Sequence, residues 1–389
     1  MSPAVALLNV LLTAGAVFLA AHAGMLPDIA GYSAGVGVVA VAAVLAAGGT
    51  TLTFVTGSDE ARHAVRRVRT RITVPILVAA ALAGAAFYGE TSDVSPWSVL
   101  LGGITVAATN LVEIESAVLQ AHEQILRWAF VVLVSRGTVV CLILAGVGFS
   151  VAMAVGAVAT LFGAYLFARR FATRKPPGQG SLRRAMRTAY KPSLATVAML
   201  DVFINRSPYV IAPLVLPTAT AGAIAVMFNT QQGLGGLALS GLYTSMTIRS
   251  QERTDPGAQA RMQVLERRLL AVAIALATAS IAATPLIVSM LNLNALPWTD
   301  TAWVLLALAI PLIAWNRARQ YLFLSLSLES RARTVLAAIA APVVVVLGVG
   351  AWIRSPVVIA AAPIIGEACA MLFLHGRYGP IHRPKVTTS

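Results

Sequence analysis

The stretch "RRFATRKPPGQGSLRRAMRTAYKP", residues 169–192, decides how this chain is organised. It contains eight Lys or Arg residues and no acidic residue. In a water-soluble protein such a run would indicate a nucleic-acid-binding arm. Here, however, 58% of the 389 residues are hydrophobic and 11% are charged, whereas soluble domains are about 45–50% apolar and about 25% charged. The basic stretch therefore has to be explained within a membrane protein.

Apolar segments of about 20 residues, the length that crosses roughly 30 Å of hydrocarbon, follow one another on both sides of this stretch. The connections between them are too short to hold a separate soluble domain. We predict an all-α polytopic membrane protein of about twelve transmembrane helices, six before and six after the basic stretch. The predicted spans are 4–22, 32–56, 72–89, 96–120, 128–147, 149–168, 192–213, 219–247, 269–291, 299–321, 334–353 and 356–374, with a turn at "GVGFS" (146–150) dividing the fifth from the sixth.

The positive charges follow this division of the chain. Of the 29 Lys and Arg residues, 26 lie in alternate connections or in the tail, including five in 62–71 and four in 317–333. The charged residues of the other connections are one arginine, Arg354, and four acidic residues. Since Lys and Arg concentrate in cytoplasmic loops, we predict that both termini are cytoplasmic.

The basic stretch then becomes a cytoplasmic linker, residues 169–191, between two six-helix units at 1–168 and 192–374, and residues 375–389 form a cytoplasmic tail. Its second part, "SLRRAMRTAYK", can form a helix that lies on anionic lipid headgroups. Membrane orientation accounts for the excess of positive charge, so no nucleic-acid partner is predicted.

Other familiar signals are weak in this sequence. Cys141 and Cys369 lie in apolar segments, and the five histidines have no metal-ligand spacing, so we predict no disulfide framework, metal site or cofactor. "LAAHAG" (19–24) resembles a signal-peptide cleavage site. The first twenty residues carry no Lys or Arg, and the segment is therefore predicted to be a retained first span.

The two halves share one recognisable element. It reads "GYSAGVGVVAVAAVLAAGGTTLTFVTGS" from Gly31 and "ATAGAIAVMFNTQQGLGGLALSGLYTSM" from Ala219, each rich in small residues and each with a Gly-Gly pair. Both halves begin on the same side, so the pattern indicates parallel repeats, with shared membrane composition as the alternative. Small residues such as Gly31 and Gly35 allow helices to pack closely.

These segments, together with "SLATVAMLDVFINRSPYVIAPLV" (193–215) and the region 286–336, resemble the polysaccharide and O-antigen flippases (Wzx-type) of the multidrug/oligosaccharidyl-lipid/polysaccharide (MOP) exporter superfamily. The resemblance implies two six-helix bundles around a central cavity in a bacterial cytoplasmic membrane. It also implies export of a polyprenyl-diphosphate-linked oligosaccharide by alternating access, with H⁺ or Na⁺ coupling and other polysaccharide-assembly proteins as partners.

Two other functions compete with this one. A drug or cation antiporter of the same superfamily would need a cavity dominated by carboxylates, whereas Arg136 and Arg206 favour an anionic headgroup. A membrane glycosyltransferase or polymerase would need large outer loops to build an active site, and the predicted outer connections are about ten residues or fewer. No nucleotide-binding or hydrolase motif is present, so we predict that the chain is not an enzyme.

Charged residues inside the spans are the candidate functional residues, because each costs roughly 2.5–3.5 kcal/mol on insertion. In span seven, Asp201 and Asn205 share a helix face, and Pro208 is expected to break the helix beyond Arg206. Arg206 could bind a diphosphate from a central cavity, with Arg136 as a second contact. The alternative is an internal Asp201–Arg206 ion pair that only cancels two charges.

Glu113, Asp201 and Glu367 are the candidates for proton or sodium coupling. Glu113 lies on one face with Asn110, and its alternative role is an ion pair with Arg136 on the next span. Span eight presents a stripe of polar residues that suits sugar hydroxyls, although amides also join helices to one another. From this stripe and its surroundings we predict Asn205, Asn229, Gln232 and Tyr243 as substrate-binding residues.

Overall fold

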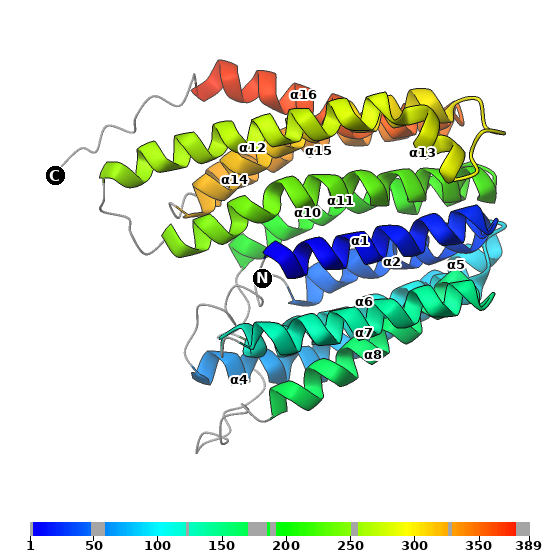
Figure 1. Cartoon of the computed structure of the whole chain (residues 1–389), viewed down its shortest axis with the longest axis horizontal. Coiled ribbons are helices and arrows are strands. Elements are labelled where there is room, and N and C mark those ends of the chain that lie inside the picture. Colours follow the sequence, from blue (N-terminus) through cyan, green and yellow to red (C-terminus); the bar gives the residue numbers. More distant parts are fainter. Residues whose placement is uncertain are drawn as a thin grey trace.

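The computed structural model describes residues 3–47, 59–121, 124–169, 185–186, 192–249, 256–325 and 329–378. Every regular element in these ranges is a helix, which confirms the predicted all-α class. Most of the predicted basic linker and all but the first four residues of the predicted tail lie outside the described residues. The helices run along the long axis of the molecule (Figure 1).

The first half contains α1 (Pro3–His22), α2 (Leu26–Ala47), α4 (Asp59–Val68), the π-helical turn η1 (Arg69–Thr73), α5 (Val74–Thr91), α6 (Pro96–Ala121), α7 (Ile125–Leu144) and α8 (Phe149–Ala168). The second half contains α10 (Pro192–Val215), α11 (Thr218–Arg249), α12 (Pro256–Ala282), α13 (Thr284–Met290), α14 (Thr299–Ser325), α15 (Glu329–Trp352) and α16 (Pro356–Tyr378).

The chain is a multi-pass helical membrane protein. Within the described residues, eight helices are long and apolar enough to cross a membrane, or nine if the bent pair α12–α13 counts as one span. A helix lies on each of the twelve predicted ranges, but α1, α10 and α11 do not meet the same criteria of length and composition. The number of twelve spans therefore stays a prediction.

Two local predictions can be compared directly with the helix boundaries. The turn expected in 146–150 is present, since α7 ends at Leu144 and α8 begins at Phe149. The expectation that Pro208 breaks the helix is wrong, because α10 continues through Pro208 and Pro213 to Val215. Near these prolines, side chains of other helices donate to α10 carbonyl groups: Gln232 donates to Asn205 and Tyr88 to Val210. Proline is tolerated in membrane helices where neighbouring helices supply such bonds.

The predicted ninth span is bent. Helix α12 ends at Ala282, and α13 continues at 67° to it. Pro285 has no N–H group to donate to the Ile281 carbonyl. The Thr284 hydroxyl donates to this carbonyl instead, at 2.7 Å. The bend thus has a local chemical cause, which a prediction from apolar length overlooks.

Helices α2 and α6 pack with their backbones in contact. A Cβ atom placed on Gly35 would lie 1.9 Å from the Val99 carbonyl oxygen, and one on Gly102 would lie 2.1 Å from the Tyr32 carbonyl oxygen. Both distances are far below any real contact, so only glycine fits at these two positions. The prediction that small residues on α2 allow close packing is confirmed here.

Asp28, near the start of α2, joins three helices of the first half. Its Oδ1 atom accepts a hydrogen bond of 2.5 Å from the Ser98 hydroxyl on α6. Its Oδ2 atom accepts one of 2.9 Å from the backbone N–H of Ser150 in the first turn of α8. A carboxylate at a helix N-terminus is favourable because the unpaired N–H groups there carry partial positive charge. Helices α2, α6 and α8 are therefore fixed to one another at this end.

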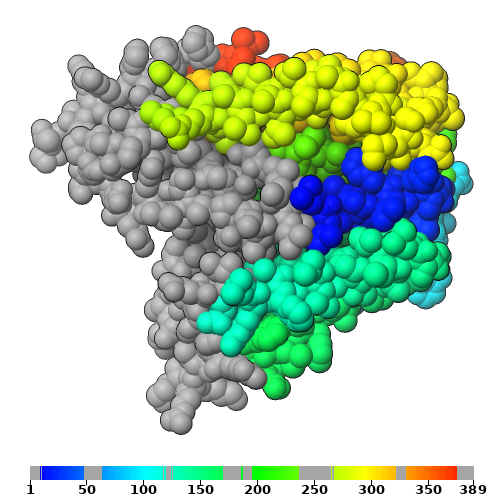
Figure 2. Space-filling model, viewed as in Figure 1, coloured from blue at the N-terminus to red at the C-terminus, as the bar shows by residue number. Residues whose placement is uncertain are grey.

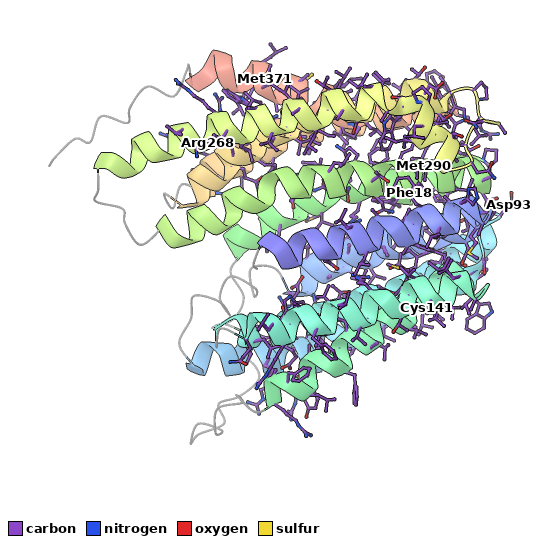
Figure 3. The ribbon with its side chains drawn as sticks, in the orientation of Figure 1. Phe18, Asp93, Cys141, Arg268, Met290 and Met371 are labelled. Carbon is purple, nitrogen blue, oxygen red and sulfur yellow. The ribbon has the colours of Figure 1, made fainter. Side chains whose placement is uncertain are left out.

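The two halves meet through α1 and α2 of the first half and α10 and α11 of the second. A Cβ atom on Gly222 of α11 would lie 2.0 Å from the Leu26 carbonyl oxygen on α2. The Tyr88 hydroxyl on α5 donates a hydrogen bond of 2.6 Å to the Val210 carbonyl on α10. Helices α2 and α11 both begin at the end of the molecule where Asp93 is found (Figures 1 and 3). Toward the opposite end, α8 and α12 diverge (Figure 1).

Candidate functional site

Two half-buried arginines from opposite halves both lie within electrostatic range of Tyr32. Arg206 on α10 lies over the ring of Tyr209, with its Cζ atom 5.4 Å from the ring centroid. The Arg136 Nε atom on α7 donates a hydrogen bond of 3.0 Å to Asn9 Oδ1 on α1. The hydroxyl of Tyr32 on α2 lies within electrostatic range of both guanidinium groups. The structure thus brings together positive charge from two helices that are far apart in the sequence.

Neither Arg136 nor Arg206 has a carboxylate partner among the described residues. The suggested ion pair between Asp201 and Arg206 is therefore wrong. Five residues along a helix correspond to a rotation of about 140°, so the two side chains leave α10 in different directions. Arg206 lies near α2, where the Arg206 carbonyl oxygen would be 3.4 Å from a Cβ atom on Gly37.

The carboxylates of α6 have other partners than those suggested from the sequence. Glu113 pairs with Arg69 of η1 at 2.9 Å, and Glu115 pairs with Arg66 of α4. Arg69 is 2% exposed and also donates to the Asn110 carbonyl at 2.7 Å. The suggested pairing of Glu113 with Arg136 is therefore wrong. Residues 62–71, predicted to be a connection, belong to α4 and η1, which are joined to α6 by these ion pairs.

The partner of Asp201 is Arg317 on α14. This pair is not evident from the sequence, because Arg317 and Arg319 fall among the charges of a predicted cytoplasmic connection. Both are buried within α14, at 7% and 5% exposure. The available signal was the apolar sequence on both sides of "WNRARQ" (315–320), which places these arginines inside a helix. Arg317 also donates to Gln320 Oε1 at 2.8 Å.

Glu367 on α16 lies next to this pair. It is 2% exposed, and its Oε2 atom accepts a hydrogen bond of 2.7 Å from Asn316 Nδ2 on α14. The same amide donates to the Glu367 backbone carbonyl at 2.9 Å. Glu367 is also within electrostatic range of Arg317 and Asp201. Two of the three predicted coupling carboxylates therefore belong to one cluster, while Glu113 belongs to the other half.

The predicted sugar-binding amides are all hydrogen-bonded within the protein, Asn205 inside its own helix and the other two between α10 and α11. Asn205 Nδ2 donates to Asp201 Oδ1 at 3.1 Å, which confirms that these two residues share a face. Gln232 Nε2 donates to the Asn205 carbonyl at 2.9 Å, and Asn229 Oδ1 accepts from the Tyr209 hydroxyl at 3.0 Å. The side chain of Tyr243 lies outside the described residues. A role of these residues in substrate binding stays a prediction.

We expect the Asp201–Arg317 pair to show strong coupling in stability measurements. Removing one partner of a buried ion pair leaves an uncompensated charge and typically costs about 3–5 kcal/mol. Asp201→Asn leaves the charge of buried Arg317 unpaired, whereas Arg317→Gln leaves that of Asp201, which is 38% exposed, so Asp201→Asn should cost more. The double variant should be more stable than Asp201→Asn alone. Thermal unfolding of the purified protein measures all three changes, and additive losses would contradict the pairing.

The fold can be compared with known proteins. No family model matches the sequence, and no curated protein matches it. Solved structures do match. The lipid II flippase MurJ in an inward closed conformation has a TM-score of 0.61 at 12% identity, covering 96% of this chain and 85% of its own.

Two further structures agree. The inward-facing conformation of a multidrug resistance MATE family transporter of the MOP superfamily has a TM-score of 0.61 at 13% identity, covering 95% of this chain and 94% of its own. A MOP superfamily transporter from Pyrococcus furiosus, described by the reverse polarity of its binding pocket, has a TM-score of 0.56 at 12% identity, covering 96% and 93%. At such low identity the likeness concerns the fold, which is that of the MOP transporters.

Proposed function

We propose that the chain is a flippase or exporter that moves a polyprenyl-diphosphate-linked oligosaccharide across the bacterial cytoplasmic membrane by alternating access. In this proposal twelve spans form two six-helix bundles, both termini are cytoplasmic, and H⁺ or Na⁺ drives the transport. Membrane lipids surround the protein, and other polysaccharide-assembly proteins supply its substrate. Arg136 and Arg206 bind the diphosphate, while Asn205, Asn229, Gln232 and Tyr243 lie along the path of the sugar.

The observation that carries this proposal is the absence of carboxylate partners for Arg136 and Arg206 among the described residues. A charge inside a membrane protein is costly unless it is neutralised, and a bound anion would supply the missing charge. Arg66, Arg69 and Arg317 each face a carboxylate and do not need one. A guanidinium group also matches the geometry of phosphate with two parallel donors.

The described surface has a recess between the two halves of the chain (Figure 2). Figure 2 shows α11 set back between α1 and α12, where the described residues are seen. Helix α11 carries Asn229 and Gln232, and α1 carries Asn9, the partner of Arg136. This recess supports a substrate path between the two halves of the chain.

A drug or cation exporter of the same fold is the competing function. The two neighbours named as MurJ and MATE differ in what their titles say they move, so the fold does not separate the two functions. The polarity of the site favours an anionic substrate, because two arginines with no carboxylate partner among the described residues would repel a cationic drug. We therefore place the anionic substrate first.

Transport in reconstituted vesicles tests the proposal. The probe is a short-chain polyprenyl diphosphate bearing a fluorescent sugar, and a membrane-impermeant quencher reports which leaflet it occupies. The intact protein should increase the movement of the probe between leaflets, and the variant Arg136→Gln/Arg206→Gln should not. Equal movement of a lipophilic cation in both proteins, with none of the diphosphate, would support the drug exporter instead.

Alternating access also makes a prediction about Tyr88. The variant Tyr88→Phe leaves the Val210 carbonyl on α10 without its partner from α5, a loss of about 1 kcal/mol. We expect the two halves to separate more readily at this end. Spin labels at Asp93→Cys and Asn294→Cys, both exposed, with Cys141 and Cys369 replaced by serine, measure this distance. A longer-distance population should increase, and an unchanged distribution would show that Tyr88 does not restrain the halves.

A further inference from the structure

Glu367 and Asn316 leave one hydrogen-bonding group unused. Asn316 is 0% exposed, and its Nδ2 atom donates to Glu367 Oε2. Its Oδ1 atom is buried and has no hydrogen-bond partner. A buried polar atom without a partner costs about 1–3 kcal/mol. The acceptor lies on the same amide that binds the carboxyl group, so a hydrogen atom on Glu367 could satisfy it.

One added positive charge would neutralise the ionised groups at and around Glu367. Asp201, Arg317 and Glu367 carry a net charge of −1 when all three are ionised, and one added proton makes the cluster neutral. The described side chains of α11 include no ionisable group. On α15, Ile339 and Val343 contact Gly366 beside Glu367.

The remaining charges nearby are further along the helices. Arg331 and Arg333 lie at the start of α15, about 9 Å or more along the helix from Ile339. Arg319 on α14 is directed to the ring of Trp315, at 4.3 Å. Among the described side chains, Arg317 and Asp201 are therefore the charges that act on Glu367.

We propose that Glu367 and Asn316 form a proton-binding site, which names H⁺ as the coupling ion and thus deepens the proposed function on which it rests. A proton passes from water to Glu367 Oε1, where an O–H bond forms and the carboxylate charge is lost. This O–H group then donates to Asn316 Oδ1, while Asn316 Nδ2 continues to donate to Glu367 Oε2. The acid and the amide become joined by two hydrogen bonds.

A metal cation fits this site less well than a proton. A hard cation needs several oxygen ligands, whereas a proton needs only one acceptor beyond the carboxyl group. Arg317 and the Asn205 amide both bond to Asp201 Oδ1, and the positive charge of Arg317 repels a cation from that carboxylate. The other oxygens at the site are those of Glu367 and Asn316, and an N–H group already points at one of them.

The site is connected to the substrate arginine through α10. Arg317 binds Asp201, which lies five residues before Arg206 on the same helix. When Glu367 loses its proton, Arg317 is attracted by two carboxylates in place of one. The bond between Arg317 and Asp201, which restrains α10, then weakens. Helix α10 also contacts α2 of the other half. Arg317 is thus a positioning residue between the proton site and Arg206.

Infrared difference spectroscopy of the full-length protein in lipid nanodiscs, recorded across a pH step without substrate, tests the proposal. We expect a carboxylic-acid carbonyl band that is lost in Glu367→Gln and retained in the matched control Glu115→Gln. In Glu367→Asp the band should shift in frequency, which keeps the test valid if the glutamine variant does not fold. A band that neither variant changes would overturn the proposal.

Sodium provides the second arm of the test. Replacing choline chloride by sodium chloride should leave the band of the intact protein unchanged. In Arg317→Gln, Asp201 is free to coordinate a cation, and sodium should reduce the band. Loss of the band on adding sodium to the intact protein would identify a sodium site instead. Because no substrate is present, these outcomes do not depend on whether the protein binds a lipid diphosphate.

Discussion

Replacing Arg206 by alanine is expected to weaken the binding of a short-chain polyprenyl diphosphate by about 10- to 100-fold. Hydrogen bonds to charged groups contribute about 1.5–3 kcal/mol each, and about 1.4 kcal/mol corresponds to a factor of ten. Arg206 has no carboxylate partner among the described residues, so its removal exposes no opposite charge inside the protein. Most of the loss should therefore be lost binding rather than lost folding.

The conservative variant Arg206→Lys separates charge from geometry. It keeps the positive charge but loses the two parallel donors of the guanidinium group, so we expect an intermediate affinity. Arg268→Ala is the control, because Arg268 is an exposed arginine on α12 (Figure 3). Titration of each purified variant with the fluorescent probe measures the affinities. If Arg206→Ala and Arg268→Ala bind equally well, Arg206 has no specific role in the site.

The largest loss of stability is expected for Gly35→Leu. Overpacking usually costs about 1–3 kcal/mol when side chains can adjust. At Gly35 the obstacle is the backbone carbonyl of Val99, only 1.9 Å from the added Cβ atom. The helices must therefore separate, and we expect little folded protein. Gly102→Ala should have the same effect from the other side of the contact, because its Cβ atom would meet the Tyr32 carbonyl.

Gly137→Ala is a matched control for the glycine variants. Gly137 also lies inside a helix, α7, but a Cβ atom there would have no heavy atom within 4 Å. Alanine favours a helix over glycine by up to about 1 kcal/mol, so this variant should be as stable as the original or more stable. Monodisperse yield and thermal unfolding in detergent measure the series. A stable Gly35→Leu protein would show that α2 and α6 are not in backbone contact.

The sequence predicts most of the fold because apolar length and charge periodicity are local properties. They locate the helices, the turn between α7 and α8, and the shared face of Asp201 and Asn205. They do not locate the bend after Ala282 or the continuation of α10 through Pro208. At the bend the Thr284 hydroxyl replaces a missing backbone hydrogen bond, and α10 is bonded at the Asn205 and Val210 carbonyls by side chains of other helices. Such partners are identified only in three dimensions.

The candidate site is predicted less completely. Arg136 and Arg206 are found because isolated charges in apolar segments are conspicuous. Arg317 is missed because a buried charge near the end of a helix has the same local sequence as a charge in a loop, and Asn316 is missed because it carries no charge. The expected partners of Glu113 and Asp201 are wrong for a related reason. Nearness along the chain does not show the direction in which each side chain leaves its helix.

Helix α2 has a different kind of contact on each of two faces. Through Gly35 it meets the backbone of α6, which cannot yield, while through Gly37 it meets the tip of the Val210 side chain on α10. A side chain can change rotamer and release a neighbour, but two backbones in contact can only move together. At these two positions the contact of α2 with α10 can therefore yield more readily than its contact with α6. Substitutions on the α6 face should then alter the yield of the protein, and substitutions on the α10 face its rate of turnover.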